Sequence, residues 1–270
     1  VQVDPDSEVT ITPGATQAIF CAIQAVIRSG DEVIVFAPCY DSYEPAVELA
    51  GGRCVHVPLE LPDFRVDWQR LADAITPRTR LIFIPSPHSP CGVVLSGDDL
   101  DQLAALFRAC EIWLISDEVY EHLVFDGMQH ASVLAHEELY QRALVVSSFG
   151  KTYHVTGWKT GYVVAPPALS AELRKVHQFV TFVAVTPLQH ALADFMVEHP
   201  EHITELPAFY QAKRDLFCDQ LAASRFTFSR TPGTYFQLAD YSQIRPALDD
   251  VAMAEWLTRE KGVAAIPVSV

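Results

Sequence analysis

The sequence predicts an α/β fold, in which helices sandwich a mostly parallel seven-stranded sheet and a partial, smaller α+β domain follows. Short runs of Val, Ile and Leu alternate with helical patterns over the first two-thirds of the chain. Such continuous apolar runs are typical of strands buried on both faces, as in parallel sheets. In folds of this class, ligands bind at the carboxyl ends of the strands.

Each apolar run and each helical pattern is assigned to one element. The expected strands are 8–12, 32–36, 53–58, 80–84, 112–116, 143–147 and 161–165. The expected helices are 17–27, 42–49, 67–75, 98–110 and 168–182.

The pattern changes after about residue 187. Two helices are expected at 188–197 and 208–223, joined near Pro200 and Pro207, because prolines interrupt helices. Two β-type runs (226–230 and 234–239) and a helix (251–261) follow. We therefore predict a large domain over residues 1–200 and part of a small α+β domain over residues 201–270.

Composition excludes several classes of protein. Half of the residues are hydrophobic, which indicates a globular chain, and no apolar run reaches the roughly 18 residues of a membrane span. The net charge of −15 argues against a nucleic-acid partner. Six cysteines and ten histidines show no metal-ligand spacing, so we predict no metal site and a reducing compartment, the cytoplasm. Because the sequence begins at Val1 and ends at Val270 after the strand-like run AAIPVSV, we expect a fragment.

The segment VVSSFGKTYHVTGWKTG, at 145–161, is the most informative of the chain. It contains two of the only five lysines, Lys151 and Lys159, in a setting of small and hydroxyl residues that directly follows an apolar strand. A lysine in a sheltered site next to another cation loses its proton more readily and can attack a carbonyl. Lys151 is therefore a candidate for Schiff-base chemistry, and the alternative is a lysine that merely lies in a loop.

Four other segments lie at the same edge of the sheet, and one of them, 87–92, is a rigid turn with two prolines and a glycine that follows a strand. Gly14, between a strand and a helix, permits a tight turn whose free N–H groups, with the Thr16 hydroxyl, can bind a phosphate. Asp117 follows the run IWLI, where a carboxylate needs a cationic partner or caps the next turn. Glu118 is expected at the rim, Tyr120 can reach the cavity, and Tyr40 either stacks on a ligand or packs in the core.

These groups are a phosphate cradle, an aromatic face, a carboxylate, a phenol and an amine. Pyridoxal 5′-phosphate requires this combination. The turn after residue 12 is neither a Walker loop nor a GxGxxG fingerprint, which disfavours a nucleotide.

The chain resembles the class I aminotransferases of the aspartate-aminotransferase fold, and within them the methionine and kynurenine aminotransferase branch. The resembling stretches extend from residue 12 to residue 242 and read TPGATQAI, PCYDSYEP, PSPHSPCG, ISDEVYEH, SSFGKTYHVTGWKTGY and GTYFQLADYS. The resemblance implies an enzyme that moves the amino group of an L-amino acid, such as methionine or an aromatic one, to a 2-oxo acid. It also implies a homodimer.

Carried over by position, the resemblance assigns roles to individual residues. Lys151 forms the Schiff base with pyridoxal phosphate and moves the proton, Asp117 pairs with the pyridine nitrogen, and Tyr120 binds the ring's phenolic oxygen. The other cofactor-binding residues it implies are Gly14, Ala15, Thr16, Ser148 and Lys159 at the phosphate, Gln17 nearby, Tyr40 stacked on the ring, and Ser89 at the O3′ side.

Two departures from the family pattern matter. Ser89 stands where the family has an asparagine, so we expect weaker tuning of the cofactor and lower activity. The arginine that binds the substrate carboxylate and the N-terminal arm are expected outside this sequence. Arg245 is another candidate for the role of that arginine. It follows a strand-like run in a proline-containing loop, however, so we expect its side chain to be exposed to solvent.

Three other functions stay open at this stage. The same fold can catalyse β-elimination as a C–S lyase, which needs no 2-oxo acid. The domain can be a non-catalytic, ligand-sensing part of a transcription regulator. It can also be a degenerate pseudoenzyme, for which Ser89 is the only sign.

Overall fold

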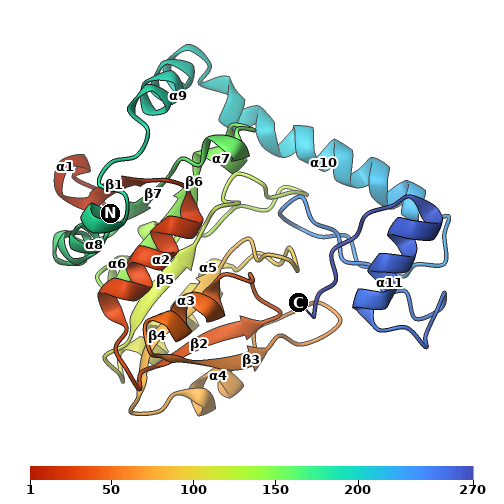
Figure 1. The fold of residues 1–270 in the computed structure, drawn as a ribbon, viewed down its shortest axis with the longest axis horizontal. Coiled ribbons are helices and arrows are strands. Elements are labelled where there is room, and N and C mark those ends of the chain that lie inside the picture. The colour runs from red at the N-terminus through yellow and green to blue at the C-terminus, as the bar shows by residue number, and fades with distance from the viewer. Residues whose placement is uncertain (270) are drawn as a thin grey trace.

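A seven-stranded sheet forms the centre of the molecule in the computed structural model, which describes residues 1–269 (Figure 1). The strand order is β1-β7-β6-β5-β4-β2-β3. The strands are β1 (Val9–Thr12), β2 (Glu32–Ala37), β3 (Arg53–Pro58), β4 (Thr79–Pro85), β5 (Trp113–Asp117), β6 (Ala143–Ser148) and β7 (Gly161–Val164). β7 is antiparallel to both of its neighbours, and the other four pairs are parallel. The predicted fold class is therefore confirmed.

Helices cover both faces of the sheet. Those of the first part of the chain are α1 (Pro5–Glu8), α2 (Ala15–Val26), α3 (Tyr43–Leu49), α4 (Trp68–Ala74), α5 (Gly97–Phe107), η1 (Val133–Ala135), α6 (Glu137–Tyr140), α7 (Phe149–Thr152), η2 (Thr156–Trp158) and α8 (Pro167–Val180). Those that follow are α9 (Thr186–Glu198), α10 (Glu201–Leu221), α11 (Asp250–Trp256) and the π-helix η3 (Leu257–Lys261).

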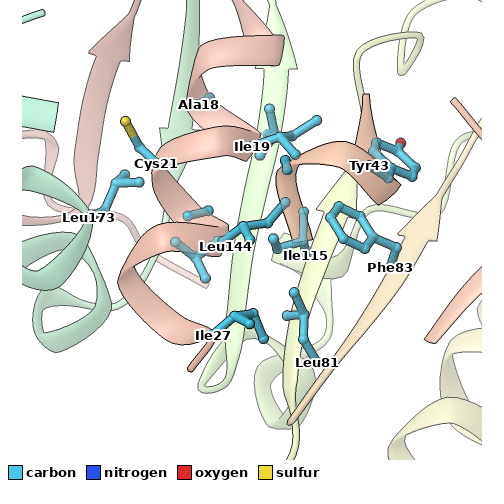
Figure 2. Close-up of a cluster of buried hydrophobic side chains, with 14 of the residues drawn as sticks. Ala18, Ile19, Cys21, Ile27, Tyr43, Leu81, Phe83, Ile115, Leu144 and Leu173 are labelled. Atoms are coloured by element: carbon cyan, nitrogen blue, oxygen red, sulfur yellow. The ribbon is translucent and has the colours of Figure 1, made fainter. Parts of the chain in front are cut away.

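Alternate residues of each central strand supply two separate cores. Val33 and Val35 of β2 point to the side of α2, α3 and α8, whereas Ile34 and Phe36 point to the side of α4 and α5. Figure 2 shows the first core, in which Ile19 of α2 and Tyr43 of α3 lie over the sheet residues Ile115 and Phe83. This two-sided burial is the physical cause of the unbroken apolar runs in the sequence.

The end of the chain differs from the prediction in four respects. Of the two runs expected as strands, 226–230 forms only an isolated bridge, from Thr227 to Asp240, and 234–239 forms none. Pro207 lies inside α10 and does not end it, because the neighbouring Leu206 is anchored in a buried cluster with Leu123 and Phe125. The helix expected at 251–261 divides into α11 and η3. No strand forms over 264–269, and Val270 lies outside the described residues.

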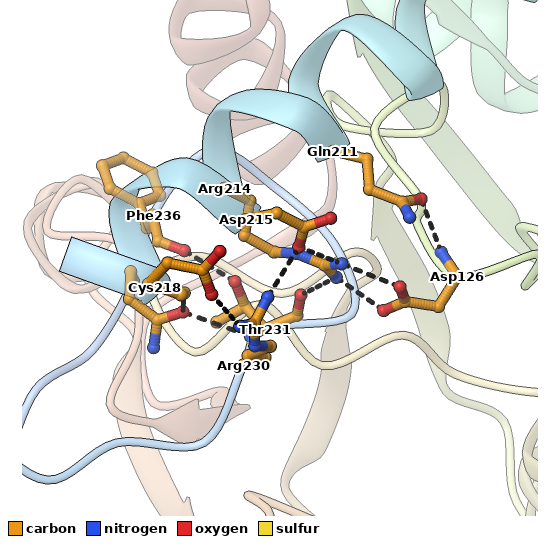
Figure 3. Close-up of polar contacts among 10 residues, drawn as sticks. Asp126, Gln211, Arg214, Asp215, Cys218, Arg230, Thr231 and Phe236 are labelled. Atoms are coloured by element: carbon orange, nitrogen blue, oxygen red, sulfur yellow. Dashed lines mark hydrogen bonds and ion pairs between the residues drawn. The ribbon is translucent and has the colours of Figure 1, made fainter. Parts of the chain in front are cut away.

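A buried arginine fastens α10 to the rest of the molecule (Figure 3). Arg214 donates to both carboxylate oxygens of Asp126, at 2.6 and 2.7 Å, and to the Thr231 carbonyl at 2.9 Å. A bidentate ion pair of this kind compensates for the free energy lost when the guanidinium is removed from water. The arginine thereby joins the segment after β5 to the segment that follows α10.

A helix that spans a membrane needs about 20 predominantly apolar residues. Among the helices of residues 1–269, none combines the length and the apolar character needed to cross a bilayer.

Candidate active site

The carboxyl ends of β1, β5 and β6 open into one large cavity of about 890 Å³. Ten of the eleven residues predicted to bind the cofactor line it. They are Gly14, Ala15, Thr16, Tyr40, Ser89, Asp117, Tyr120, Ser148, Lys151 and Lys159. The sheet thus brings together side chains from six segments that are distant in the sequence.

Gln17 is the predicted residue that does not line the cavity. Its amide nitrogen lies 3.1 Å from the sulfur of Cys21, 3.1 Å from Nδ1 of His177 and 3.4 Å from the hydroxyl of Thr181. The side chain therefore leaves the first turn of α2 on the side that packs against α8. Helical geometry explains this, since residues next to each other on a helix point in different directions.

One end of the cavity has the features of an anion site. Gly14 precedes α2 with φ of 81°, and no side chain caps this helix, so its first N–H groups are available to a ligand. A β-carbon placed on Gly14 would lie 3.3 Å from Cε and 3.5 Å from Nζ of Lys159, which shows how closely this ammonium approaches the turn. Ser148, which precedes α7, makes no capping bond with its side chain. These groups fit a bound phosphate.

The register of the sheet explains why these groups meet. Gly161, the first residue of β7, is opposite Thr12 of β1 on one side and opposite Ser148 of β6 on the other. A β-carbon on Gly161 would lie 2.7 Å from the Ser147 carbonyl oxygen and 3.0 Å from the Ala15 nitrogen. Only a glycine allows the three segments to approach this closely.

Asp117 lies at the end of β5 and is 6% exposed. Burial raises the pKa of its carboxyl above the ordinary value. Hydrogen bonds from the Tyr43 hydroxyl, at 2.6 Å, and from the Val119 N–H, at 3.3 Å, lower this pKa, and so does the charge of Lys151. A buried carboxylate with two donors and a free side toward the cavity fits a cationic ring nitrogen.

Tyr43 was not predicted from the sequence as a site residue. Its phenol is fully buried, stacks on Phe83 with ring centroids 4.2 Å apart, and donates to Asp117. Tyr40 precedes α3, whereas Tyr43 is its first residue, and the two rings meet edge to face with centroids 5.7 Å apart. Tyr40 is 37% exposed at the cavity, with its hydroxyl 3.3 Å from that of Thr16.

Lys151 extends into the cavity from α7, the turn that follows β6. Its Nζ donates to the hydroxyl oxygen of Tyr235 at 2.7 Å, and Tyr120 donates to the same oxygen at 3.3 Å. Burial is the main cause that raises the pKa of the Tyr120 phenol above its ordinary value, so this phenol stays protonated. Tyr235 was not predicted from the sequence as a site residue, because its segment resembles a strand of the small domain.

Two expectations about charged residues have opposite outcomes. Glu118 was expected at the rim, and this is wrong: it is 1% exposed and accepts bonds from the Ser116 hydroxyl and the Val133 N–H. Nε2 of His130 lies 2.8 Å from its carboxylate, so the charge is compensated within the fold. Arg245 is exposed as predicted, with its guanidinium 4.4 Å from the centre of the Trp256 ring.

Comparison with known proteins decides the family. The model of the family described as "Aminotransferase class I and II" matches residues 1–270. The chain belongs to this aminotransferase family. The family depends on pyridoxal phosphate, so the chain is part of a transaminase.

Several relatives of this aminotransferase have known names or structures. The methionine aminotransferase of Escherichia coli is 53% identical over 269 residues, which cover 100% of this chain and 69% of that protein. Mouse kynurenine–oxoglutarate transaminase 1 is 34% identical, with 99% of this chain and 70% of the relative covered. A solved E. coli structure with a methionine aminotransferase function has a TM-score of 0.96 and 52% identity, and covers 100% of this chain and 71% of that one.

We predict that replacing Tyr43 by phenylalanine destabilises the aminotransferase chain more at pH 8 than at acidic pH. The phenol stabilises the ionised form of Asp117, so its removal raises the pKa of this carboxyl further. The wild-type advantage should therefore be small while Asp117 is protonated and grow to about 1.5–3 kcal/mol as pH rises through this pKa. Urea unfolding of the cofactor-free protein at several pH values measures it.

The matched control is Tyr241→Phe, which removes a hydroxyl that donates to the neutral Leu248 carbonyl. Its cost in unfolding free energy should not vary with pH. An equal, pH-independent cost for Tyr43→Phe would contradict the account of Asp117.

Proposed function

We propose that this chain holds pyridoxal 5′-phosphate in the large cavity and takes methionine or an aromatic amino acid as the amino donor. The observation that supports the proposal most strongly is the common cavity of Lys151, Asp117 and Lys159. An amine, a buried carboxylate and a fixed cation match the aldehyde, ring nitrogen and phosphate of this cofactor, in that order. When bound, the cofactor supplies a carbonyl for amino-group transfer and a ring that accepts electrons from the substrate carbon.

The residues have separate roles in this proposal. Lys159, with the N–H groups at the start of α2 and the Ser148 hydroxyl, would bind the phosphate. Asp117 would hold a proton at the ring nitrogen, and Tyr43 would keep Asp117 ionised so that it can do so. Lys151 would bind the cofactor covalently through Nζ and later give and take the proton at the substrate carbon.

The proposed donor class rests on two observations. The E. coli relative at 53% identity is named a methionine aminotransferase, and the mouse relative is named a kynurenine transaminase. The cavity also has many apolar side chains, which suit an apolar substrate because a charged substrate side chain would lose water without a partner. They include Ile19, Phe217, Phe236, Leu238, Met253 and Ile266.

The division of the chain into a large domain (1–200) and part of a small one (201–270) remains a prediction. It is supported by the position of α10, which begins at Glu201 after the last helix of the first part. The proposed location is the cytoplasm, and the six cysteines, all free thiols, support a reducing compartment.

We predict that the full-length protein transaminates methionine and phenylalanine with kcat/KM at least about 10-fold above that for aspartate or lysine, because the cavity lining is apolar. A coupled assay with a panel of donors and one 2-oxo acid measures this. Release of pyruvate and ammonia from cystathionine without any 2-oxo acid would favour the C–S lyase and contradict the proposal.

Asp117→Asn should lower kcat by about 10²–10³-fold while changing the dissociation constant of the cofactor much less. The reason is that the carboxylate gains most when charge develops on the ring during the reaction. Asp63→Asn in an exposed loop, where the carboxylate makes only a 3.9 Å pair with Arg65, serves as the control. A loss of cofactor affinity as large as the loss of rate would refute the role.

We further propose that the full-length protein is a homodimer that uses the end of α8, the segment after it and α9. Large apolar side chains are exposed there, and they are Phe179, Val180, Phe182, Val183, Val185, Phe195, Met196 and Val197. Monomers rarely expose so many large apolar side chains along one stretch of chain, and such a surface can pair with a copy of itself around a twofold axis.

Light scattering of the full-length protein at micromolar concentration should give the mass of a dimer. The double variant Phe179→Glu/Phe182→Glu should give a monomer, since it places charges in the proposed contact. Leu61→Glu, in an exposed loop, should leave the dimer intact. A monomeric wild-type protein would exclude the homodimer.

A further inference from the structure

Tyr235 occupies a special place beside the free amine of Lys151. Its hydroxyl oxygen accepts a hydrogen bond from Nζ of Lys151 at 2.7 Å and one from the Tyr120 hydroxyl at 3.3 Å. The ammonium also lies 5.4 Å from the centre of the Tyr235 ring and 5.8 Å from that of Tyr120. An acceptor oxygen favours the charged form of an amine, and so does the nearby Tyr120 ring. The Tyr235 ring itself adds no such attraction, because Nζ lies along its C–O bond, at the edge of the ring.

The backbone around Tyr235 is tightly held, so its phenol has a defined position. Thr234 adopts a φ of 65° and its N–H donates to the Leu123 carbonyl at 2.9 Å. A β-carbon on Gly233 would lie 2.9 Å from side-chain atoms of Pro87 and Val94. The Pro232 carbonyl accepts from the Phe125 N–H, and Arg214 binds the carbonyl of the preceding residue, Thr231 (Figure 3).

This segment comes from the part of the chain after α10, yet it is fastened to the residues that follow β5. Gly92, in the motif that contains Ser89, packs against it as well, since a β-carbon there would meet Thr231 at 2.7 Å. The Tyr235 phenol is therefore held in a fixed position relative to Asp117 and Tyr120, which lie at the end of β5 and just beyond it. A phenol in a fixed position can hold the reactive amine of Lys151 in a defined orientation.

We propose that Tyr235 is a positioning residue for Lys151, and that its hydroxyl oxygen, supported by Tyr120, holds the amine as an ammonium whenever Nζ carries no covalent bond. The inference rests on the proposed function of Lys151, which must release its bond to the cofactor, carry a proton and form that bond again. While Nζ rests on Tyr235, the proton stays on the nitrogen. It becomes available for donation when the ammonium leaves the phenol.

Other ionisable groups act on the same amine. Asp117 on β5 attracts the ammonium, and Lys159 after η2 lines the same cavity and repels it. Tyr40, Asp41, Tyr241, Asp250 and Lys261 line the rest of the cavity. Tyr235 differs from all of these because its oxygen is the hydrogen-bond acceptor that the structure gives to Lys151.

The test uses the cofactor-free protein, so that it does not depend on activity. A small amine-modifying reagent is applied over a range of pH, and the rate at Lys151 is followed by mass spectrometry of its peptide, which is practical because the chain has only five lysines. In Tyr235→Phe the rate–pH profile of Lys151 should move to lower pH by about half a unit to one unit, as expected for the loss of one hydrogen bond to a charged group.

Two further variants separate this effect from a general disturbance. Tyr120→Phe should shift the profile less than Tyr235→Phe does, because the Tyr120 hydroxyl bonds to Tyr235 and not to Lys151. Tyr241→Phe, which removes a hydroxyl elsewhere in the cavity, should leave the profile unchanged. A profile in Tyr235→Phe that superimposes on that of the wild type would overturn the inference.

Reduction with borohydride in the presence of pyridoxal phosphate distinguishes the two proposals. Attachment at Lys151 together with an unchanged profile in Tyr235→Phe would refute only the role of Tyr235. A shifted profile without attachment at Lys151 would refute only the proposed function.

Discussion

The site depends on the hydrogen-bond register of β7, the single strand that runs against its neighbours. Gly161 at the start of this strand is opposite both Thr12 and Ser148, and it has no side chain to separate the segments beside it. This register brings the N-terminus of α2, the end of β6 and Lys159 to one point. A cation and free N–H groups gather there without a fold-wide positive charge, since the chain carries −15 overall.

A second constraint connects the core with the chemistry. Asp117 is buried, so an ionised carboxylate there is unfavourable unless donors compensate for the lost water. Tyr43 is one such donor, and its ring is held by stacking on Phe83, a residue of the sheet core that Figure 2 displays. Under the proposed function, the packing of the first hydrophobic core determines where Asp117 would hold a proton in the cavity, so part of the site lies among residues of the core.

The sequence was sufficient for the sheet, the strand-end residues and the family, because buried parallel strands and small residues at turns leave strong local patterns. It was insufficient where position depends on tertiary contacts. Tyr43 and Tyr235 were not predicted, because their hydrogen-bond partners, Asp117 and Lys151, lie 74 and 84 residues away in the sequence. Glu118 was wrongly predicted at the rim, because the sequence does not show that Ser116, Val133 and His130 surround its buried carboxylate. Pro207 was expected at the end of a helix, but it lies inside α10, which tertiary packing stabilises.

We propose that the amine of Lys151 bonds covalently to a vitamin B6 aldehyde whose ring nitrogen faces Asp117. A crystal structure of the full-length protein with pyridoxal phosphate tests it most directly. We expect continuous electron density from Nζ of Lys151 to the aldehyde carbon, the ring nitrogen within hydrogen-bond distance of Asp117, and the phosphate beside Gly14 and Lys159. Density that joins the aldehyde to another lysine, or a ring nitrogen turned away from Asp117, would contradict the account.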